Sequence, residues 1–139
     1  MPDPCLRPGN TNGDGTPEVA WKIQRGIPEI PSPVCYEGKV FLVRDGGLVE
    51  CLNADSGTVL YNERAGVGGG YAGSPIAANG RLYLASQSGT IIVIDASSDQ
   101  LKVLASNALG EKITATPAMA EDKLYVRTER HLFAFGARP

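Results

Sequence analysis

Three stretches of this chain repeat one pattern of polar and apolar positions. In each, a turn residue and a basic residue are followed by an apolar, an aromatic and another apolar residue. The three stretches are residues 38–42, 80–84 and 122–126. Pro33, Pro75 and Pro117 precede them at a constant interval of 42 residues, with no gap in the register. A fixed period of this size is the signature of a repeat architecture, so it has to be explained before any other feature.

A period near 40 residues fits either an all-helical repeat or a four-stranded propeller blade. No segment shows apolar residues at the helical spacing of i, i+3, i+4 and i+7. Each unit instead contains short runs rich in Val, Ile, Leu, Tyr and Phe, separated by turn signals such as Asn79-Gly80. In the second unit this chemistry predicts strands over residues 73–78, 81–86, 90–94 and 101–105. Asp95 is expected to cap the turn after the third strand.

The middle strands of each unit are apolar at successive positions, so both of their faces are expected to be buried. Residues 40–43 and 91–94 show this most clearly. A sheet with one face in water would alternate apolar and polar residues, whereas a blade packed between two other blades would not. The sequence therefore predicts an all-β fold, a β-propeller built of 42-residue, four-stranded antiparallel blades.

Predicted blades account for the chain from residue 18 onward. Residues 1–17 are expected to form a loop-like N-terminal tail, because prolines and glycines leave no room for a regular element. Residues 18–24, with the only tryptophan, Trp21, predict the outer strand of a closing blade. Residues 30–64 and 70–107 predict complete blades, and residues 112–136 predict a blade without its outer strand. The chain thus holds three blades' worth of strands, which is a partial propeller or half of a six-bladed ring.

Composition fits a core-forming domain, since 42% of the 139 residues are hydrophobic, 20% are charged and the net charge is −2. This near-neutral balance, with no cluster of Lys and Arg, argues against a nucleic-acid surface. No run approaches the ~18 apolar residues of a membrane span. The first residues show neither the basic nor the apolar region of a secretory signal, so we expect no signal peptide in this chain.

The three cysteines give no sign of a metal site. Cys5, Cys35 and Cys51 lack the C-x-x-C spacing of a structural zinc site. Cys35 and Cys51 fall on predicted strands, where the favoured interpretation is a small buried apolar residue, with a disulfide as the alternative.

A weak calcium-loop candidate lies near the N-terminus, where Asn10, Asn12, Asp14 and Glu18 place oxygen-bearing side chains around glycine turns. An EF-hand would need a bidentate glutamate at its twelfth position, which is Trp21 here. A linker rich in Gly, Asn and Asp is the favoured interpretation, so no metal is predicted.

Residues 47–61 resemble the repeat of the pyrroloquinoline-quinone-like (PQQ-like) β-propellers. In that repeat, a strand ending Ala-Leu-Asp-Ala is followed by a Thr-Gly turn and a strand ending in tryptophan. Here Ser56-Gly57 stands at the turn, Asn53 at the aspartate and Tyr61 at the tryptophan, while Asp99 replaces the glycine in the next unit. The segment around Trp21 resembles the closing strand of a preceding blade. The resemblance covers about residues 18–136.

The resemblance specifies a fold and leaves the activity open, because the family includes quinone-dependent dehydrogenases, outer-membrane assembly lipoproteins and many other extracytoplasmic proteins. It implies a periplasmic or secreted bacterial protein. A dehydrogenase of this family would be expected to show an adjacent cysteine pair, an aromatic platform for the quinone and an acidic calcium site, and this sequence shows none of them. Its only histidine, His131, has no evident partner. We therefore expect no enzyme activity, no cofactor and no binding of pyrroloquinoline quinone. The alternative is a fragment of a larger extracytoplasmic quinoprotein-like enzyme whose catalytic blades are absent.

Polar residues at the turns between second and third strands have no role in packing the predicted fold. In propellers, these turns and the entries into the first strands share one rim of the channel, so residues far apart in sequence can converge there. A ligand or another protein is therefore expected to bind at this rim, in a non-catalytic binding or assembly module. The candidate binding residues are Arg44, Asp45, Tyr71, Gln87, Arg127 and Glu129.

Three blades do not close a ring, since propellers close with about four to eight. Two open faces of apolar strands would exceed the apolar patch that a soluble monomer usually exposes. We expect the chain to pair with itself, as a homodimer that forms a six-bladed ring. Residues 18–24 of each subunit would then pair with the last blade of the other and bury Trp21 at the junction. In a longer chain, further blades would take the same places.

Overall fold

The computed structural model describes residues 6–136, with side chains from residue 12 onward, and these residues form strands and no helix. A short hairpin comes first, formed by β1 (Leu6–Thr11) and β2 (Pro17–Val19). The first blade contains β3 (Val34–Tyr36), β4 (Lys39–Arg44), β5 (Leu48–Asn53) and β6 (Val59–Arg64). The second contains β7 (Ile76–Ala78), β8 (Arg81–Ala85), β9 (Thr90–Asp95) and β10 (Val103–Ala108). The third contains β11 (Ala118–Ala120), β12 (Lys123–Arg127) and β13 (Leu132–Phe135).

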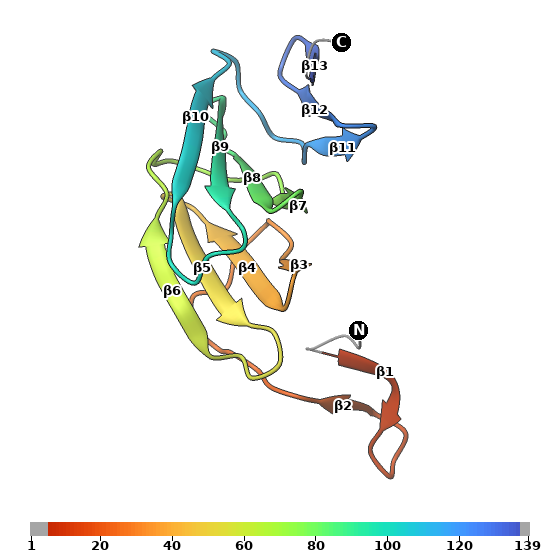
Figure 1. Cartoon of the computed structure of the whole chain (residues 1–139). Helices are drawn as coiled ribbons and strands as arrows, with labels where there is room; N and C mark the ends of the chain where they lie inside the picture. Colours follow the sequence, from red (N-terminus) through yellow and green to blue (C-terminus); the bar gives the residue numbers. More distant parts are fainter. Residues whose placement is uncertain (1–5, 137–139) are drawn as a thin grey trace.

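Every blade is an antiparallel meander, in which each strand pairs with the next along the chain. The three blades follow one another along an arc, and the β1–β2 hairpin projects from the N-terminal end (Figure 1). This arrangement confirms the predicted all-β, propeller-type fold. In the second blade, the fourth strand begins at Val103, two residues later than predicted, and the loop before it is closed by a hydrogen bond from the Asp95 amide to the Lys102 carbonyl at 2.9 Å.

A primed turn joins the first two strands of each blade, and it needs positive φ at both central residues. Asn79 and Gly80 have φ of 52° and 74°, as their sequence predicts. Glu121 and Asp122, with φ of 50° and 61°, adopt the same turn without a glycine. After the third strand of the second blade, Asp95 Oδ1 accepts a hydrogen bond from the Ser97 amide at 2.8 Å, which confirms the predicted cap.

Middle strands of the first two blades are buried on both faces. All four residues from Val40 to Val43 are buried. Phe41 and Val43 pack against the second blade, whereas Val40 and Leu42 pack on the opposite face beneath Trp21. A smaller cluster, which includes Ile91, Val93, Ile113 and Val126, joins the second blade to the third.

Hydrogen bonds between blades repeat with the same period as the sequence. The Ser32 amide donates to Ser74 Oγ at 2.8 Å, and the Ser74 amide donates to Thr116 Oγ1 at 2.9 Å. These hydroxyl residues precede the periodic prolines. The 42-residue repeat therefore reflects a bonding pattern that is passed from one blade to the next.

The N-terminal prediction is wrong in two respects. Residues 6–11, expected to be loop-like, form β1, because the tight turn over residues 12–16 returns the chain onto β2 and supplies a strand partner. The strand predicted over residues 18–24 lies instead at Pro17–Val19, and residues 20–24 are not part of a strand. These residues leave the hairpin and run to the first blade without a neighbouring backbone ladder.

The calcium-loop candidate contributes the turn of this hairpin. Asp14 Oδ1 accepts hydrogen bonds from the Thr16 hydroxyl at 2.7 Å and from the Thr16 amide at 3.0 Å, which lowers the pKa of Asp14. The Asn12 side chain also donates to the Thr16 hydroxyl. Glu18 is exposed on β2, and the side chain of Asn10 lies outside the described part.

The two cysteines on strands differ. Cys51 in β5 is fully buried, as predicted, and burial raises the pKa of its thiol to about 11. The prediction is wrong for Cys35, which is exposed because the middle position of the short first strand β3 faces solvent while its neighbours are half-buried.

Candidate functional site

The structure brings three of the predicted rim residues, Arg44, Asp45 and Tyr71, to the wall of one cavity. Arg44 ends β4, Asp45 follows it in the turn, and Tyr71 comes from the glycine-rich segment that enters the second blade. The cavity has a volume of about 240 Å³. Its remaining walls come from the chain entering the first blade, at Ile27, Glu29, Ile30 and Pro31.

Backbone contacts hold Tyr71 in this wall. Asp45 Oδ1 accepts a hydrogen bond from the Tyr71 amide at 2.8 Å, and the Tyr71 hydroxyl donates to the Val67 carbonyl at 2.5 Å. Gly47 permits this close approach, since a Cβ at that position would lie 2.4 Å from the Val67 carbonyl oxygen. Burial raises the pKa of Tyr71 to about 12, so the ring is a neutral structural part of the wall.

Gln87 occupies the position in the second blade that Asp45 occupies in the first. The backbone amide of Gln87 donates to the Gly70 carbonyl at 2.8 Å. The Gln87 side chain lies so close to Gly70 that a Cβ at Gly70 would collide with Gln87 Oε1. Gln87 therefore contacts the segment that carries Tyr71 and lies next to the cavity without lining it.

Arg127 and Glu129 belong to the third blade and do not line this cavity. The Glu129 amide donates to the Lys112 carbonyl at 2.9 Å, in the same periodic position as the Gln87 bond. Arg127 is the exposed last residue of β12, where the first two blades carry Val43 and Ala85. A shared binding role for all six residues remains a prediction.

Sequence reasoning missed two buried polar groups, one of them on Arg44 in the cavity wall. Glu50 in β5 is only 8% exposed, and both its Oε2 and the Nε of Arg44 are buried without a hydrogen-bond partner among the described residues. Arg44 uses Nη2 to donate to Asn62 Oδ1 at 3.2 Å. Gly26, with φ of 71°, lies next to both side chains, and a Cβ added to it would be 3.3–3.4 Å from the Arg44 guanidinium and from Glu50 Oε2. A lone glutamate within the apolar run of residues 48–52 was the signal available in the sequence.

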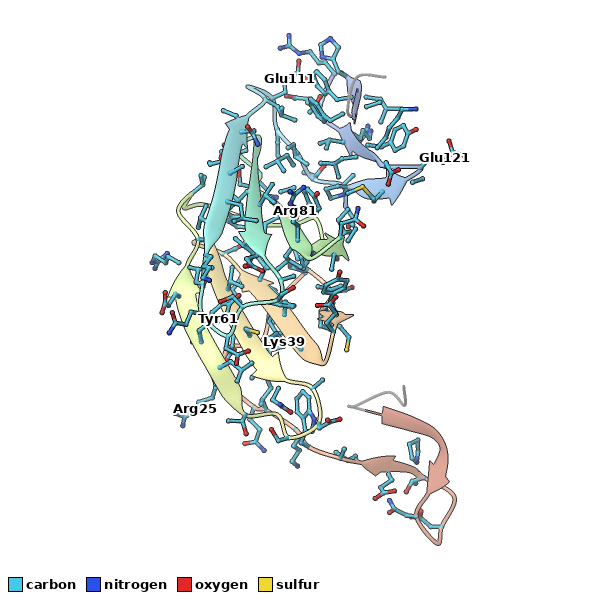
Figure 2. The ribbon with its side chains drawn as sticks, in the orientation of Figure 1. Arg25, Lys39, Tyr61, Arg81, Glu111 and Glu121 are labelled. Atoms are coloured by element: carbon cyan, nitrogen blue, oxygen red, sulfur yellow. The ribbon has the colours of Figure 1, made fainter. Side chains whose placement is uncertain are left out.

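A second missed cluster surrounds Glu111 at the end of the third blade (Figure 2). Its carboxylate lies 2.8 Å from His131 Nδ1 and 3.2 Å from Arg130 Nε, and it accepts a hydrogen bond from the Thr128 hydroxyl at 2.5 Å. The bonds from Thr128 and His131 lower the pKa of Glu111 to about 2. No spacing rule links Glu111 to a turn 20 residues away, so this cluster could not be predicted from the sequence.

The Glu111 cluster fastens a turn of the third blade to the segment that enters the blade. The side chain of Glu111 is 9% exposed and that of His131 is 60% exposed. The Thr128 hydroxyl, which would be the nearest nucleophile, donates to the carboxylate and also lies 3.2 Å from the His131 carbonyl oxygen. These bonds order the turn rather than aim a nucleophile at a substrate.

Trp21 and Tyr61 occupy equivalent places at two blade junctions. Trp21 Nε1 donates to the Ala54 carbonyl at 2.9 Å, and its ring lies on Gly57. Tyr61 packs against the second blade beside Ala96, and burial raises its pKa above its usual range. Lys39 reaches across that junction to Asp99, 3.4 Å away, at the position where the first blade has Gly57. The junction with glycine, at Gly57, holds the larger Trp21, and the junction with Asp99 in its place holds the smaller Tyr61.

In the part of the chain that the structure describes, no three His, Cys, Asp or Glu side chains gather as a metal site would require. Nor does any helix in that part have the length and apolar character needed to cross a membrane.

Stacked antiparallel blades, periodic blade-to-blade bonds and aromatic residues docked at the junctions define the chain as part of a β-propeller. The family model described as outer membrane protein assembly factor BamB matches residues 12–101 and 63–138. The chain belongs to this family of PQQ-like repeat proteins. No curated protein gave a match.

Solved structures with the same fold include both an assembly factor and enzymes. BamB from Moraxella catarrhalis matches with a TM-score of 0.69 and 18% identity, over 87% of this chain and 37% of BamB. A europium-containing methanol dehydrogenase matches with a TM-score of 0.61 and 19% identity, over 78% of this chain and 22% of the enzyme. The quinohemoprotein alcohol dehydrogenase ADHIIG from Pseudomonas putida HK5 matches with a TM-score of 0.58 and 16% identity, over 77% of this chain and 17% of the enzyme. At such identities the likeness is one of fold, and the chain spans little more than a third of BamB.

Proposed function

We propose that this chain is a non-catalytic binding and assembly module, which works by docking its open blade faces and channel rim onto other polypeptides. The observation that carries this proposal is the pair of unfinished ends. Among the described residues, the third blade ends at β13, the edge of its sheet, where Leu132 is 72% exposed. At the other end, Trp21 is docked on the first blade as the outer strand of a preceding blade would dock it.

The unfinished ends are complementary to each other. Within residues 6–136 the third blade has no outer strand, and residues 20–24 run beside the first blade without belonging to a strand. A second copy of the chain supplies each missing piece, giving a homodimer with six blades in which residues 18–24 of one subunit pair with β13 of the other. Further blades of a longer chain would meet the same surfaces.

The channel rim is the proposed site for a different partner or a ligand. Arg44, Asp45 and Tyr71 already share a cavity, and Gln87 adjoins it. Arg127 and Glu129 would extend the rim on the third blade. Replacing Arg44 and Arg127 together by alanine should weaken binding of an identified partner, and unchanged binding would exclude this assignment.

A second candidate function, a fragment of a larger quinoprotein-like enzyme, is favoured by the fold shared with the two dehydrogenases. The described residues do not fit the quinone. Trp21, which could serve as an aromatic platform, is committed to Ala54 and Gly57, and Cys51 is buried inside a strand and separated from Cys35. Calorimetry with pyrroloquinoline quinone and calcium should show no binding, whereas micromolar binding would favour the enzyme. We further propose a periplasmic or secreted location in a bacterium.

Light scattering coupled to size-exclusion chromatography tests the homodimer. We expect twice the mass of one chain, and loss of the dimer when residues 1–25 are deleted. A monomeric mass for the folded full-length chain would refute the dimer. A dimer that survives the deletion would refute strand exchange. Leu132→Ser on the open edge should weaken the dimer, while Glu121→Ser, an exposed substitution at the turn before β12, serves as the matched control.

A further inference from the structure

The junction between the second and third blades lacks an aromatic residue equivalent to Trp21 and Tyr61 at the other two junctions. The strand registers make the comparison unambiguous. Tyr61 in β6 is the pairing partner of Cys51, and Ala105 in β10 is the pairing partner of Val93, which is 42 residues beyond Cys51. Ala105 therefore stands where the first blade presents Tyr61.

The surface that receives the ring is equivalent at all three junctions. Each junction presents one apolar pair, formed by the second and third strands of the following blade. The pairs are Val40 with Leu52, Leu82 with Ile94, and Leu124 with Phe135. Trp21 packs against the first pair and Tyr61 against the second. At the third pair, the equivalent residue is Ala105, whose side chain is only a methyl group.

Burial shows the consequence of this difference. Val40, Leu52, Leu82 and Ile94 are all buried, whereas Leu124 is half-buried and Phe135 is 40% exposed. Two adjoining hollows occupy the space. One, of about 300 Å³, is lined by apolar residues and one amide, namely Tyr83, Ile91, Val93, Asn107, Leu109, Leu124 and Phe135. The other, of about 310 Å³, is lined by Arg81, Tyr83, Val93, Leu104 and Ala105. The two hollows share Tyr83 and Val93, so together they form one groove along the junction. Arg81, at the start of β8, marks its position in Figure 2.

Missing blades would not supply the ring that this junction lacks. At the other two junctions, the ring comes from the segment on the N-terminal side, so the third junction depends on β10, which is present. In an outer strand added to β13, the side chain equivalent to Tyr61 would face the next junction along the ring. The third junction therefore lacks its ring whether the propeller is closed by a second copy or by further blades.

We infer that this groove, defined by Tyr83, Val93, Ala105, Leu124 and Phe135, binds a tyrosine or tryptophan side chain presented by a partner polypeptide. Apolar cavities of about 150 Å³ already accommodate a benzene ring, so the volume is sufficient. The natural occupants of the equivalent places, Trp21 and Tyr61, are side chains of this kind.

The strand beside the groove explains why a polypeptide would deliver the ring. β10 is the edge strand of its sheet, so its outer backbone groups are available to pair with an extended segment. Such a segment would carry a side chain over Ala105 and into the groove. The exposed Leu104 and the polar groups of Arg81 and Asn107 surround the entrance. That the source of the ring is a partner polypeptide rests on the proposed binding function, whereas the groove itself does not.

Filling the groove from within provides the test. Ala105→Tyr should restore the missing ring and raise the urea midpoint of unfolding. Ser106→Tyr, at the exposed neighbouring position whose side chain points to the other face of the strand, should leave the midpoint unchanged. In the unmodified chain, N-acetyltyrosinamide and p-cresol should shift the NMR signals of Val93 and Leu124. These shifts should be lost in Ala105→Tyr and retained in Ser106→Tyr.

Each outcome decides one element of the proposal. Probe binding that survives Ala105→Tyr, or an unchanged midpoint for that variant, would overturn the groove. Binding of p-cresol without N-acetyltyrosinamide would overturn a side chain attached to a backbone in favour of a free aromatic molecule. Tyr61→Ala should open an equivalent groove at the second junction, between the first and second blades, seen as a second probe site, and if this variant fails to fold the Ala105→Tyr comparison still decides. The mass of the assembly, which tests the homodimer, is measured independently of these shifts.

Discussion

The contact between Trp21 and Gly57 can be tested by adding a single methyl group. Gly57 has φ of 73°, and a Cβ placed there would lie 2.7 Å from the Trp21 ring. Gly38 has nearly the same backbone conformation, with φ of 76°, but nothing lies within 4 Å of its Cβ position. Gly57→Ala and Gly38→Ala therefore introduce the same backbone strain, and they differ in the collision with the indole.

The difference between the two variants can be estimated. Each alanine acquires left-handed backbone strain of about 1–2 kcal/mol. Gly57→Ala also displaces the indole, which loses its hydrogen bond to the Ala54 carbonyl, worth about 1 kcal/mol. The half-buried ring also loses apolar burial worth about 1 kcal/mol. We expect Gly57→Ala to lower the free energy of unfolding by about 2 kcal/mol more than Gly38→Ala does.

Urea unfolding followed by far-UV circular dichroism measures both losses. The fluorescence of Trp21, the only tryptophan, should shift to longer wavelength in Gly57→Ala and not in Gly38→Ala. In a Trp21→Ala background, the excess cost at Gly57 should vanish. Equal losses for the two alanine variants, or an excess that persists without the indole, would refute the proposed docking of Trp21.

Three further predictions follow from the buried and bonded groups. The pKa of Glu111 is lowered to about 2 from its usual 4.5, so its contribution to stability should be complete above about pH 4.5 and should disappear as the pH falls toward 2; Glu111→Gln should flatten that part of a pH–stability curve, and Glu121→Gln should leave it unchanged. Cys51 should resist iodoacetamide in the folded chain and react after unfolding in urea, as peptide mass spectrometry would show, and native labelling of Cys51 at the unfolded rate would contradict its burial. Ser74→Ala should cost about 1 kcal/mol in urea unfolding by leaving the Ser32 amide without its acceptor, whereas Ser74→Thr should cost less, and equal costs would exclude this hydrogen bond.

Much of the fold could be predicted because its determinants are local and repeated. The constant interval between Pro33 and Pro75 established the repeat unit, and Asn79-Gly80 located a hairpin from the backbone preferences of two residues. Strand boundaries at blade edges were less certain, because the fourth strand depends on pairing with the third rather than on its own composition. β1 was missed for the same reason, because Pro8 and Gly9 are atypical of a strand and the strand forms only where a turn brings it onto β2.

The candidate site could be predicted only in part. Turn positions indicated that Arg44, Asp45 and Tyr71 could converge, because strand ends meet at the rim of a propeller. Glu111 and His131 are joined across two turns, and no local rule connects them. The vacancy beside Ala105 depends on comparing registers between blades, and the two-residue offset of β10 relative to β6 conceals it from a simple count of 42 residues.

Ser74 takes part in the hydrogen bonds to both neighbouring blades. Its hydroxyl accepts a bond from the Ser32 amide of the blade before, and its amide donates a bond to the Thr116 hydroxyl of the blade after. Because the same donor and acceptor recur in each blade, this hydrogen bond is alike at both junctions and does not specify the number of blades. Duplication or loss of a 42-residue segment could change the number of blades without a new kind of bond between them. We therefore expect the angle between neighbouring blades to depend on the residue packed at each junction, Trp21, Tyr61 or Ala105.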